Sequence, residues 1–280
     1  MSRSLILSEQ FTDSVPAVAN DLREHCEDRT ALLASLMASW QGDARIRAAL
    51  LWGSFGRDEA DDLSDLDPWL IVTEDAAAEI GPSLRHYAEQ TGSLITGKNT
   101  PKHAPPGGGY MSFLHEGHHG LLQVDCYWQP QSTVPAEAEY AVLFDRQAEA
   151  HAGQEYPKRD HPEETVGLQA EVENGLNFAW FMFLITAKYL ARNAASDLSL
   201  MFYPQPGLEE AATRLGQAEL FGPEDWAVPA KPLEKVDRLR HLVGKTEQLR
   251  LVANAQGCTF SLAYMPCLFR YLDMVEGILR

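Results

Sequence analysis

The feature that most constrains this chain is a pair of apolar runs, 46–52 and 66–73, that flank a polar stretch rich in aspartate. Runs of this length and composition predict two buried β-strands joined by a short connection. Asp65 and Asp67 stand at the start of the second run with one leucine between them. Side chains on a strand repeat every two residues, so both carboxylates should point to the same side of the sheet.

The residues around this acidic pair indicate a site for a cation and phosphate. Two carboxylates this close repel each other unless one is protonated or a cation such as Mg²⁺ lies between them. Gly53 and Ser54 end the first run, where backbone N–H groups and a hydroxyl can approach phosphate oxygens without a bulky side chain in the way. Ser64, just before the acidic pair, should cap or turn the entry to the second strand.

A third acid, Asp125, lies in the run LLQVDCYW. The runs 110–114 and 121–128 are typical of a β-hairpin, whose second strand can pair beside the first two. Three carboxylates on neighbouring strands predict a two-metal site. Such a site can hold a nucleoside triphosphate, polarise its α-phosphate, activate an attacking hydroxyl and stabilise the departing pyrophosphate.

The remaining pattern divides the chain into an α/β half and a helical half. The first half should also contain helices at 27–42 and 75–90, a loop at 97–109 and a strand at 141–144. After about residue 150 the strand pattern ends. We therefore expect an α+β protein whose mixed sheet and flanking helices occupy 1–150, while a helical bundle occupies 151–280.

Three long helices are expected in the second half. Asp160 and Glu163 resemble a capping box ahead of the first, and Pro232 should begin another that ends near Gly257. The segment 264–279 should form the last. The buried face of the first helix is predicted to carry Val172, Leu176, Ala179, Phe183 and Leu190.

Composition excludes several classes of protein. With 23 basic and 40 acidic residues among 280, the formal charge is −17, so a surface that neutralises many nucleic-acid phosphates is not expected. The four cysteines form no C-x-x-C pair and the chain opens with no secretory leader, which favours reduced thiols in the cytoplasm. The longest strongly apolar stretch, 178–185, is far too short to cross a membrane.

The phrase GSFGRDEADDLSDLD, followed by Asp125, resembles the nucleotidyltransferase superfamily that includes DNA polymerase β. With a helical second half, it is most similar to bacterial aminoglycoside and lincosamide adenylyltransferases. The resemblance implies that Asp65 and Asp67 hold Mg²⁺, and that Ser54 touches the β- or γ-phosphate. It also implies that Asp125 shares the metal or accepts the substrate proton.

This resemblance makes transfer of AMP from ATP to a hydroxyl of a small molecule the expected activity, with two Mg²⁺ ions. The acceptor would be a molecule such as an aminoglycoside or lincosamide antibiotic. Arg57 and Lys188 would neutralise triphosphate charge, and the helical half would close over the nucleotide and bind the acceptor. Two alternatives stay open, an antitoxin-type nucleotidyltransferase that acts on a protein partner, and a pseudoenzyme that binds nucleotide without turnover. The acceptor, the nucleotide base, the oligomeric state and the identity of the general base are all left open.

Two other short motifs resemble known functional sites, and Pro68 bears on the position of the second strand. The stretch 115–119 matches the H-E-x-x-H zinc signature, but the glycines beside it favour a hairpin turn. The stretch 92–98 nearly spells a phosphate loop, but Asn99 stands where a Ser or Thr is required. Pro68 lacks the N–H that a central strand donates, which predicts that the second strand lies at a sheet edge there.

Overall fold

The computed structural model describes residues 16–100, 103–131, 139–146, 167–192 and 203–280, and the chain divides into two compact units. The first unit holds the β-sheet, the helix α1 (Pro16–Gly42) from Leu22 onward, and α3 (Gly81–Gln90). The second unit holds the C-terminal helices, the start of α1 and the hairpin tip 118–121. The boundary expected at residue 150, and the expected capping box at Asp160, lie outside the described residues.

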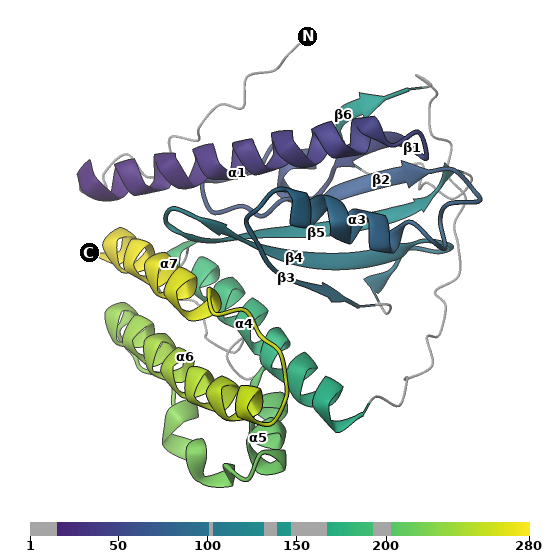
Figure 1. The fold of residues 1–280 in the computed structure, drawn as a ribbon. Helices are drawn as coiled ribbons and strands as arrows, with labels where there is room; N and C mark the ends of the chain where they lie inside the picture. The colour runs from purple at the N-terminus through teal and green to yellow at the C-terminus, as the bar shows by residue number, and fades with distance from the viewer. Residues whose placement is uncertain (1–15, 101–102, 132–138, 147–166, 193–202) are drawn as a thin grey trace. The chain divides into compact units, whose positions relative to one another are not determined.

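The sheet has six strands in the order β3-β4-β5-β2-β1-β6 (Figure 1). Their bounds are β1 Ile46–Leu51, β2 Pro68–Val72, β3 Leu94–Asn99, β4 Gly109–Gly117, β5 Gly120–Pro130 and β6 Ala141–Asp145. Strand β2 pairs with β5 in parallel, whereas β1 pairs with β2 and β6 in antiparallel fashion, as β3 does with β4. The sheet is therefore mixed, and with the helices that follow it confirms the predicted α+β class.

One face of the sheet packs against α1 and α3, which lie over it in Figure 1. The apolar residues of this core alternate along the strands, as expected for a sheet with one buried face. They come from both helices and four strands, and include Leu36, Trp40, Leu70, Leu84, Met111, Val124 and Cys126. Trp128 also belongs to this core, and its indole Nε1 donates a 2.9 Å hydrogen bond to the carbonyl of Ala77. Acidic and polar residues at the intervening positions are thereby directed to the opposite face.

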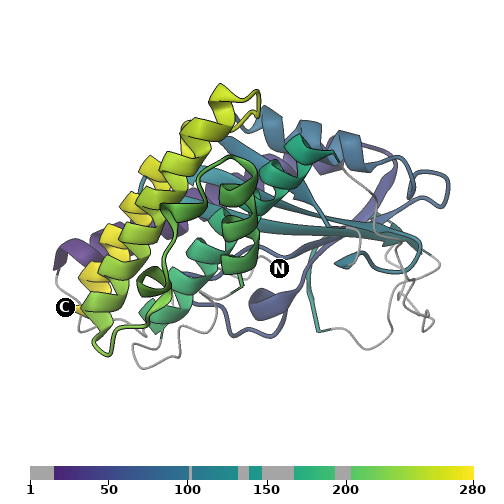
Figure 2. The same ribbon diagram turned by 90° about the horizontal axis from the view of Figure 1, so that it is seen from below.

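Besides the start of α1 and the hairpin tip, the described residues of the second unit form four helices and two short 3₁₀ turns. The helices are α4 Leu168–Arg192, α5 Gln205–Arg214, α6 Pro232–Ala255 and α7 Tyr264–Leu279, and the turns are η5 Ala218–Leu220 and η6 Pro223–Trp226. Helix α4 contacts α5, α6 and α7, and α6 lies beside α7 in both Figure 1 and Figure 2. The predicted face of α4 is confirmed as buried, and Trp180 on the same helix stacks on Tyr264 with ring centroids 5.0 Å apart.

Several predicted elements differ from the structure. The expected loop at 97–109 was wrong at its start, because β3 extends through Asn99 and pairs with β4. The helix expected from residue 75 begins at Gly81, and α1 starts eleven residues before the expected 27. Helix α5 was not expected. The hairpin at 110–128 is confirmed, and its turn lies at the H-E-x-x-H stretch, with Gly120 at a φ of +120°.

Pro68 does not mark a sheet edge, so that prediction was wrong. Strand β2 lies between β1 and β5, inside the sheet. Pro68 is the first residue of β2, a position where a proline costs little because the regular ladder begins after it. The backbone hydrogen bond to the neighbouring chain is made here by the preceding residue. The carbonyl oxygen of Asp67 accepts a 2.9 Å hydrogen bond from Trp52 N, so the missing N–H of Pro68 is not needed for it.

Two expectations from composition can also be compared with the structure. All four cysteines are free thiols in buried positions, at Cys26, Cys126, Cys258 and Cys267. In the part of the chain that the structure describes, no helix is long and apolar enough to cross a membrane.

Candidate functional site

The backbone brings the three predicted aspartates to one region of the sheet. Leu66 pairs with Val124 in a parallel bridge, and the N–H of Asp125 donates a 2.8 Å hydrogen bond to the carbonyl of Leu66. Leu66 and Val124 are both buried in the core beneath the helices. Side chains alternate along extended backbone, so Asp65 and Asp67 on either side of Leu66, and Asp125 next to Val124, belong to the opposite face.

Gly53 lies so close to the side chain of Asp67 that only glycine fits at this position. Gly53 has a φ of +66°, and a Cβ atom placed on it would lie 2.2 Å from Oδ2 of Asp67. A positive φ and this close approach both require the absence of a side chain. Gly53 therefore lets the chain pass directly beside the Asp67 carboxylate.

Ser54 is the second residue of a short helical turn, α2 (Gly53–Gly56). Its Oγ is buried and has no hydrogen-bond partner within the described residues. A buried hydroxyl without a partner costs free energy, so such a group needs an explanation such as an absent ion or ligand. An anionic oxygen beside Gly53 would supply the partner, which fits a phosphate group at this position.

Asp125 is held by three side chains that the sequence analysis did not single out. The hydroxyls of Tyr110, at 2.9 Å, and of Ser112 both donate to Oδ1, and Gln123 Nε2 donates to Oδ2 at 2.8 Å. A carboxylate has roughly four lone-pair positions, so about one of them is left for a further ligand. The two-residue turn at 118–119 sets the hairpin register that places Ser112 across from Asp125.

The charges of the aspartates act on their surroundings. Burial raises the pKa of the Asp125 carboxyl above its ordinary value, and the negative charge of Asp65 raises it further, although the donated hydrogen bonds oppose the shift. Burial likewise raises the pKa of the Tyr127 phenol, and the charges of all three aspartates add to the rise. The Tyr127 phenol therefore lies close enough to Asp125, Asp67 and Asp65 for the charge of each to act on it.

The other predicted site residues have different surroundings. Ser64 is buried, and its hydroxyl donates to Oδ1 of Asp61 at 3.0 Å and accepts from the N–H of Asp61 at 2.9 Å. Arg57 is exposed and forms a 2.7 Å ion pair with Glu59. Lys188 lies on α4 in the second unit, and its side chain is buried. No nucleotide contact is tested for these residues, so their roles stay predictions.

Arg29 on α1 holds the loop that leads to the acidic pair. Its Nη1 donates to the carbonyls of Asp61, Asp62 and Ser64 at 3.0, 3.1 and 2.7 Å. The guanidinium also lies over the ring of Phe55, 5.0 Å from its centroid. No short motif marks Arg29 in the sequence, because its partners are backbone carbonyls more than thirty residues away.

An aromatic group lies on the same strands as the acids. Trp69 stacks on Tyr127 with centroids 5.0 Å apart, and Trp52 meets Trp69 edge to face at 5.0 Å. Trp69 and Tyr127 follow Asp67 and Asp125 by two residues, so alternation puts them on the face that carries the acids. The sequence analysis did not use this spacing, although the same period of two would have found the rings.

The predicted metal centre is not formed as a ready cluster. Within the described ranges, no group of three or more His, Cys, Asp or Glu side chains is arranged to hold a metal ion. The hydrogen bonds that occupy Asp125 give a physical reason, because they direct its oxygens toward Tyr110, Ser112 and Gln123. Metal binding by Asp65, Asp67 and Asp125 therefore stays a prediction.

Three comparisons with known proteins were made. No protein-family model matches the chain, and no curated protein sequence matches it. Among solved structures, the chain is similar to an aminoglycoside 6-adenyltransferase from Bacillus subtilis at 13% sequence identity and a TM-score of 0.29. That alignment covers 86% of this chain and 96% of the other.

Proposed function

We propose that this protein is a Mg²⁺-dependent nucleotidyltransferase that transfers AMP from ATP to a hydroxyl of a small molecule and releases pyrophosphate. The observation that carries the proposal is the approach of Gly53 to the Asp67 carboxylate, with the buried Ser54 hydroxyl left without a partner among the described residues. A backbone turn without side-chain bulk, a hydroxyl and paired carboxylates are the groups that a metal-bound triphosphate requires.

The predicted site residues have distinct roles in this proposal. Asp65 and Asp67 would hold Mg²⁺, which would supply positive charge to the phosphate oxygens and the departing pyrophosphate. Ser54 donates its hydroxyl to a β- or γ-phosphate oxygen, and the N–H groups of the turn at Gly53 face the same phosphates. The expected roles of Arg57, Ser64 and Lys188 around the nucleotide are part of the same proposal.

Asp125 accepts the proton of the acceptor hydroxyl. The hydroxyl oxygen forms a bond to the α-phosphorus as the bond from that phosphorus to the pyrophosphate oxygen breaks. A carboxylate is a stronger base when its pKa is raised toward neutrality, and burial raises the pKa of Asp125. Tyr110, Ser112 and Gln123 fix its orientation, which is how a catalytic base is kept in line with its substrate.

The acceptor is proposed to be a small molecule such as an aminoglycoside or lincosamide antibiotic, in keeping with the motif. The test is to incubate the protein with Mg²⁺, ATP and a panel of such compounds, and to measure pyrophosphate release. Asp65→Asn should abolish any release that the wild-type protein shows. Equal release by Asp65→Asn would refute the assignment of the metal site.

A further inference from the structure

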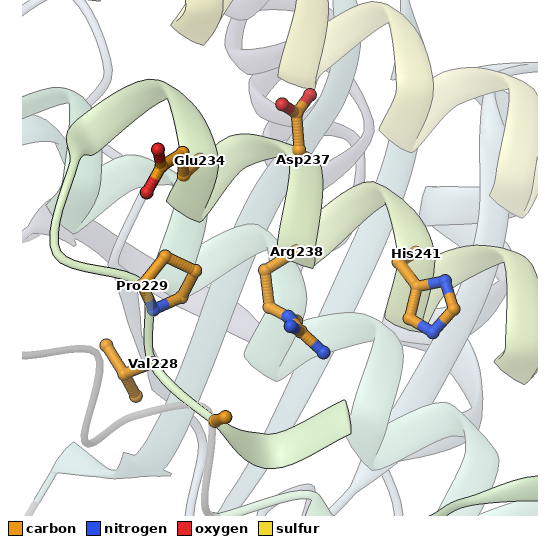
Figure 3. A pocket seen from close by; sticks show the side chains of 7 residues that line it. Val228, Pro229, Glu234, Asp237, Arg238 and His241 are labelled. Atoms are coloured by element: carbon orange, nitrogen blue, oxygen red, sulfur yellow. The ribbon is translucent and has the colours of Figure 1, made fainter. Parts of the chain in front are cut away.

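The helical unit contains an open pocket of its own, between the segment after η6 and the first half of α6 (Figure 3). Its volume is about 560 Å³. The residues that line it are Ala227, Val228, Pro229, Glu234, Asp237, Arg238 and His241. None of them is among the residues predicted to bind the nucleotide or the metal.

The two acidic residues of the pocket each lie near a cation other than Arg238. Glu234 forms a 2.8 Å ion pair with Lys231, and Asp237 lies 3.7 Å from a guanidinium nitrogen of Arg240. In Figure 3 the carboxylate of Asp237 is directed away from the side chain of Arg238. Arg240 also pairs with Asp273 and Glu276, and neither pocket carboxylate forms an ion pair with Arg238 among the described residues.

Arg238 keeps its positive charge uncompensated. Its guanidinium donates to the backbone carbonyl of Glu224, and no carboxylate forms an ion pair with it among the residues that the structure describes. An arginine has five N–H donors in a planar fork that matches a carboxylate. In Figure 3 this side chain lies between Pro229 and His241, where a ligand in the pocket would meet it.

His241 is held in place by a buried acid. Asp225 is only 1% exposed, and its two oxygens contact His241 Nε2 and Lys245 Nζ, each at 2.6 Å. The N–H of Gly222 adds a third hydrogen bond at 2.7 Å. Because an ionised carboxylate only accepts hydrogen bonds, Nε2 must carry a proton, and the ring is fixed beside Arg238.

The opposite wall is apolar and exposed. Val228 is 37% exposed, Ala227 is exposed, and Pro229 is partly buried. Small organic ligands bind where apolar walls meet a few well-placed polar groups. The pocket joins an apolar wall to a fixed imidazole and a guanidinium without an acidic partner in the described chain.

We propose that this pocket binds a small organic acid, whose carboxylate pairs with the guanidinium of Arg238 and whose apolar body lies on Val228 and Pro229. The ligand class follows from the charge and the wall together. A phosphate ion would pair with Arg238 but would not use the wall. A neutral apolar molecule would contact the wall but would form no ion pair with Arg238.

The test uses the full chain and two probes of the same shape, 4-methylpentanoate and its neutral amide, 4-methylpentanamide. Binding is measured by chemical-shift changes of the His241 ring and by calorimetry. We expect a dissociation constant on the order of millimolar for the acid and at least tenfold weaker binding for the amide. Arg238→Gln should weaken binding of the acid about tenfold, whereas Arg238→Lys should retain most of it.

Arg214→Gln is the matched control, because it removes the same charge from an exposed helical position outside the pocket. It should bind the acid as the wild-type protein does. The proposal is overturned if the amide binds as tightly as the acid, if Arg238→Gln binds unchanged, or if inorganic phosphate binds as tightly as the acid. Thermal melts of each variant show that a loss of binding is not a loss of folding.

Discussion

A Cβ atom added to Gly53 would lie 2.2 Å from Oδ2 of Asp67, so the turn after β1 and the carboxylate before β2 leave no room for a side chain. This relationship connects the first strand to the acidic pair. Any change that moves the turn must also move Asp67.

Gly53→Ala should therefore reduce both stability and Mg²⁺-dependent ATP binding. The positive φ of Gly53 and the contact with Asp67 together should lower the free energy of unfolding by about 2 kcal/mol or more. Thermal melts and calorimetry with Mg²⁺ and ATP measure the two effects. Gly92→Ala is the matched control, since Gly92 has a φ of +75° and no atom within 4 Å of its added Cβ. Equal ATP binding by both variants would contradict the role of the Gly53 turn.

Ser112→Ala should slow catalysis without weakening ATP binding. The variant removes one of the donors to Asp125, so the proposed base loses part of its fixed orientation. We expect pyrophosphate release to fall about tenfold, less than the roughly 10²- to 10⁴-fold that a positioned base contributes, because two other donors still hold Asp125. Ser39→Ala, at an exposed serine on α1, should leave release unchanged. A fall in ATP affinity with unchanged turnover would place Ser112 in the nucleotide site instead.

Arg29→Ala should loosen the loop before the acidic pair. Three carbonyls lose their donor, and we expect a destabilisation of about 2 kcal/mol. Hydrogen exchange of residues 61–66 should become faster than in the wild-type protein. Arg23→Ala on the same helix is the control, because Arg23 forms an exposed ion pair with Glu27, a kind worth little. Equal exchange in the two variants would show that Arg29 does not hold the loop.

His115 should make stability depend on pH in acid. The ring is fully buried, and burial lowers its pKa from 6.5 to about 4. The folded state thus favours the neutral ring, so this stabilisation is complete above pH 6.5 and is lost as the pH falls toward 4. The loss amounts to about 3 kcal/mol at most. Denaturant unfolding between pH 7 and 4 measures it.

His115→Gln removes the titrating ring and should flatten this part of the pH profile. In the wild-type protein, His115 Nδ1 lies 3.1 Å from Ser93 Oγ and 3.3 Å from Thr91 Oγ1. The glutamine amide can partly replace these contacts. If the wild-type protein and His115→Gln lose stability in parallel between pH 6.5 and 4, the histidine is not the group responsible.

Local patterns predicted the elements whose signals are local. Pro232 marked the start of α6, because a proline at the first helical turn costs nothing and has a fitting φ. The period of two along Asp65, Asp67 and the strand after them placed the acids on one face. Strand β3 was missed because its Gly97 and Lys98 weaken a strand pattern, and its pairing with β4 supplies what local propensity does not.

Other parts of the site depend on contacts that no local pattern records. The place of Pro68 inside the sheet follows from strand order, which is a property of the whole chain. Arg29 reaches carbonyls far along the sequence, and carbonyls are the same in every residue. The three donors around Asp125 can be predicted only when the pairing register of the hairpin is known. That register follows from the exact position of the two-residue turn.

The most direct test of the account is calorimetric titration of ATP into the wild-type protein and Asp65→Asn, with Mg²⁺ and with EDTA. The account predicts that the wild-type protein binds ATP only with Mg²⁺, and that Asp65→Asn loses this binding while it melts as a folded protein. Binding that is equal with Mg²⁺ and EDTA, or equal in the two proteins, would contradict it.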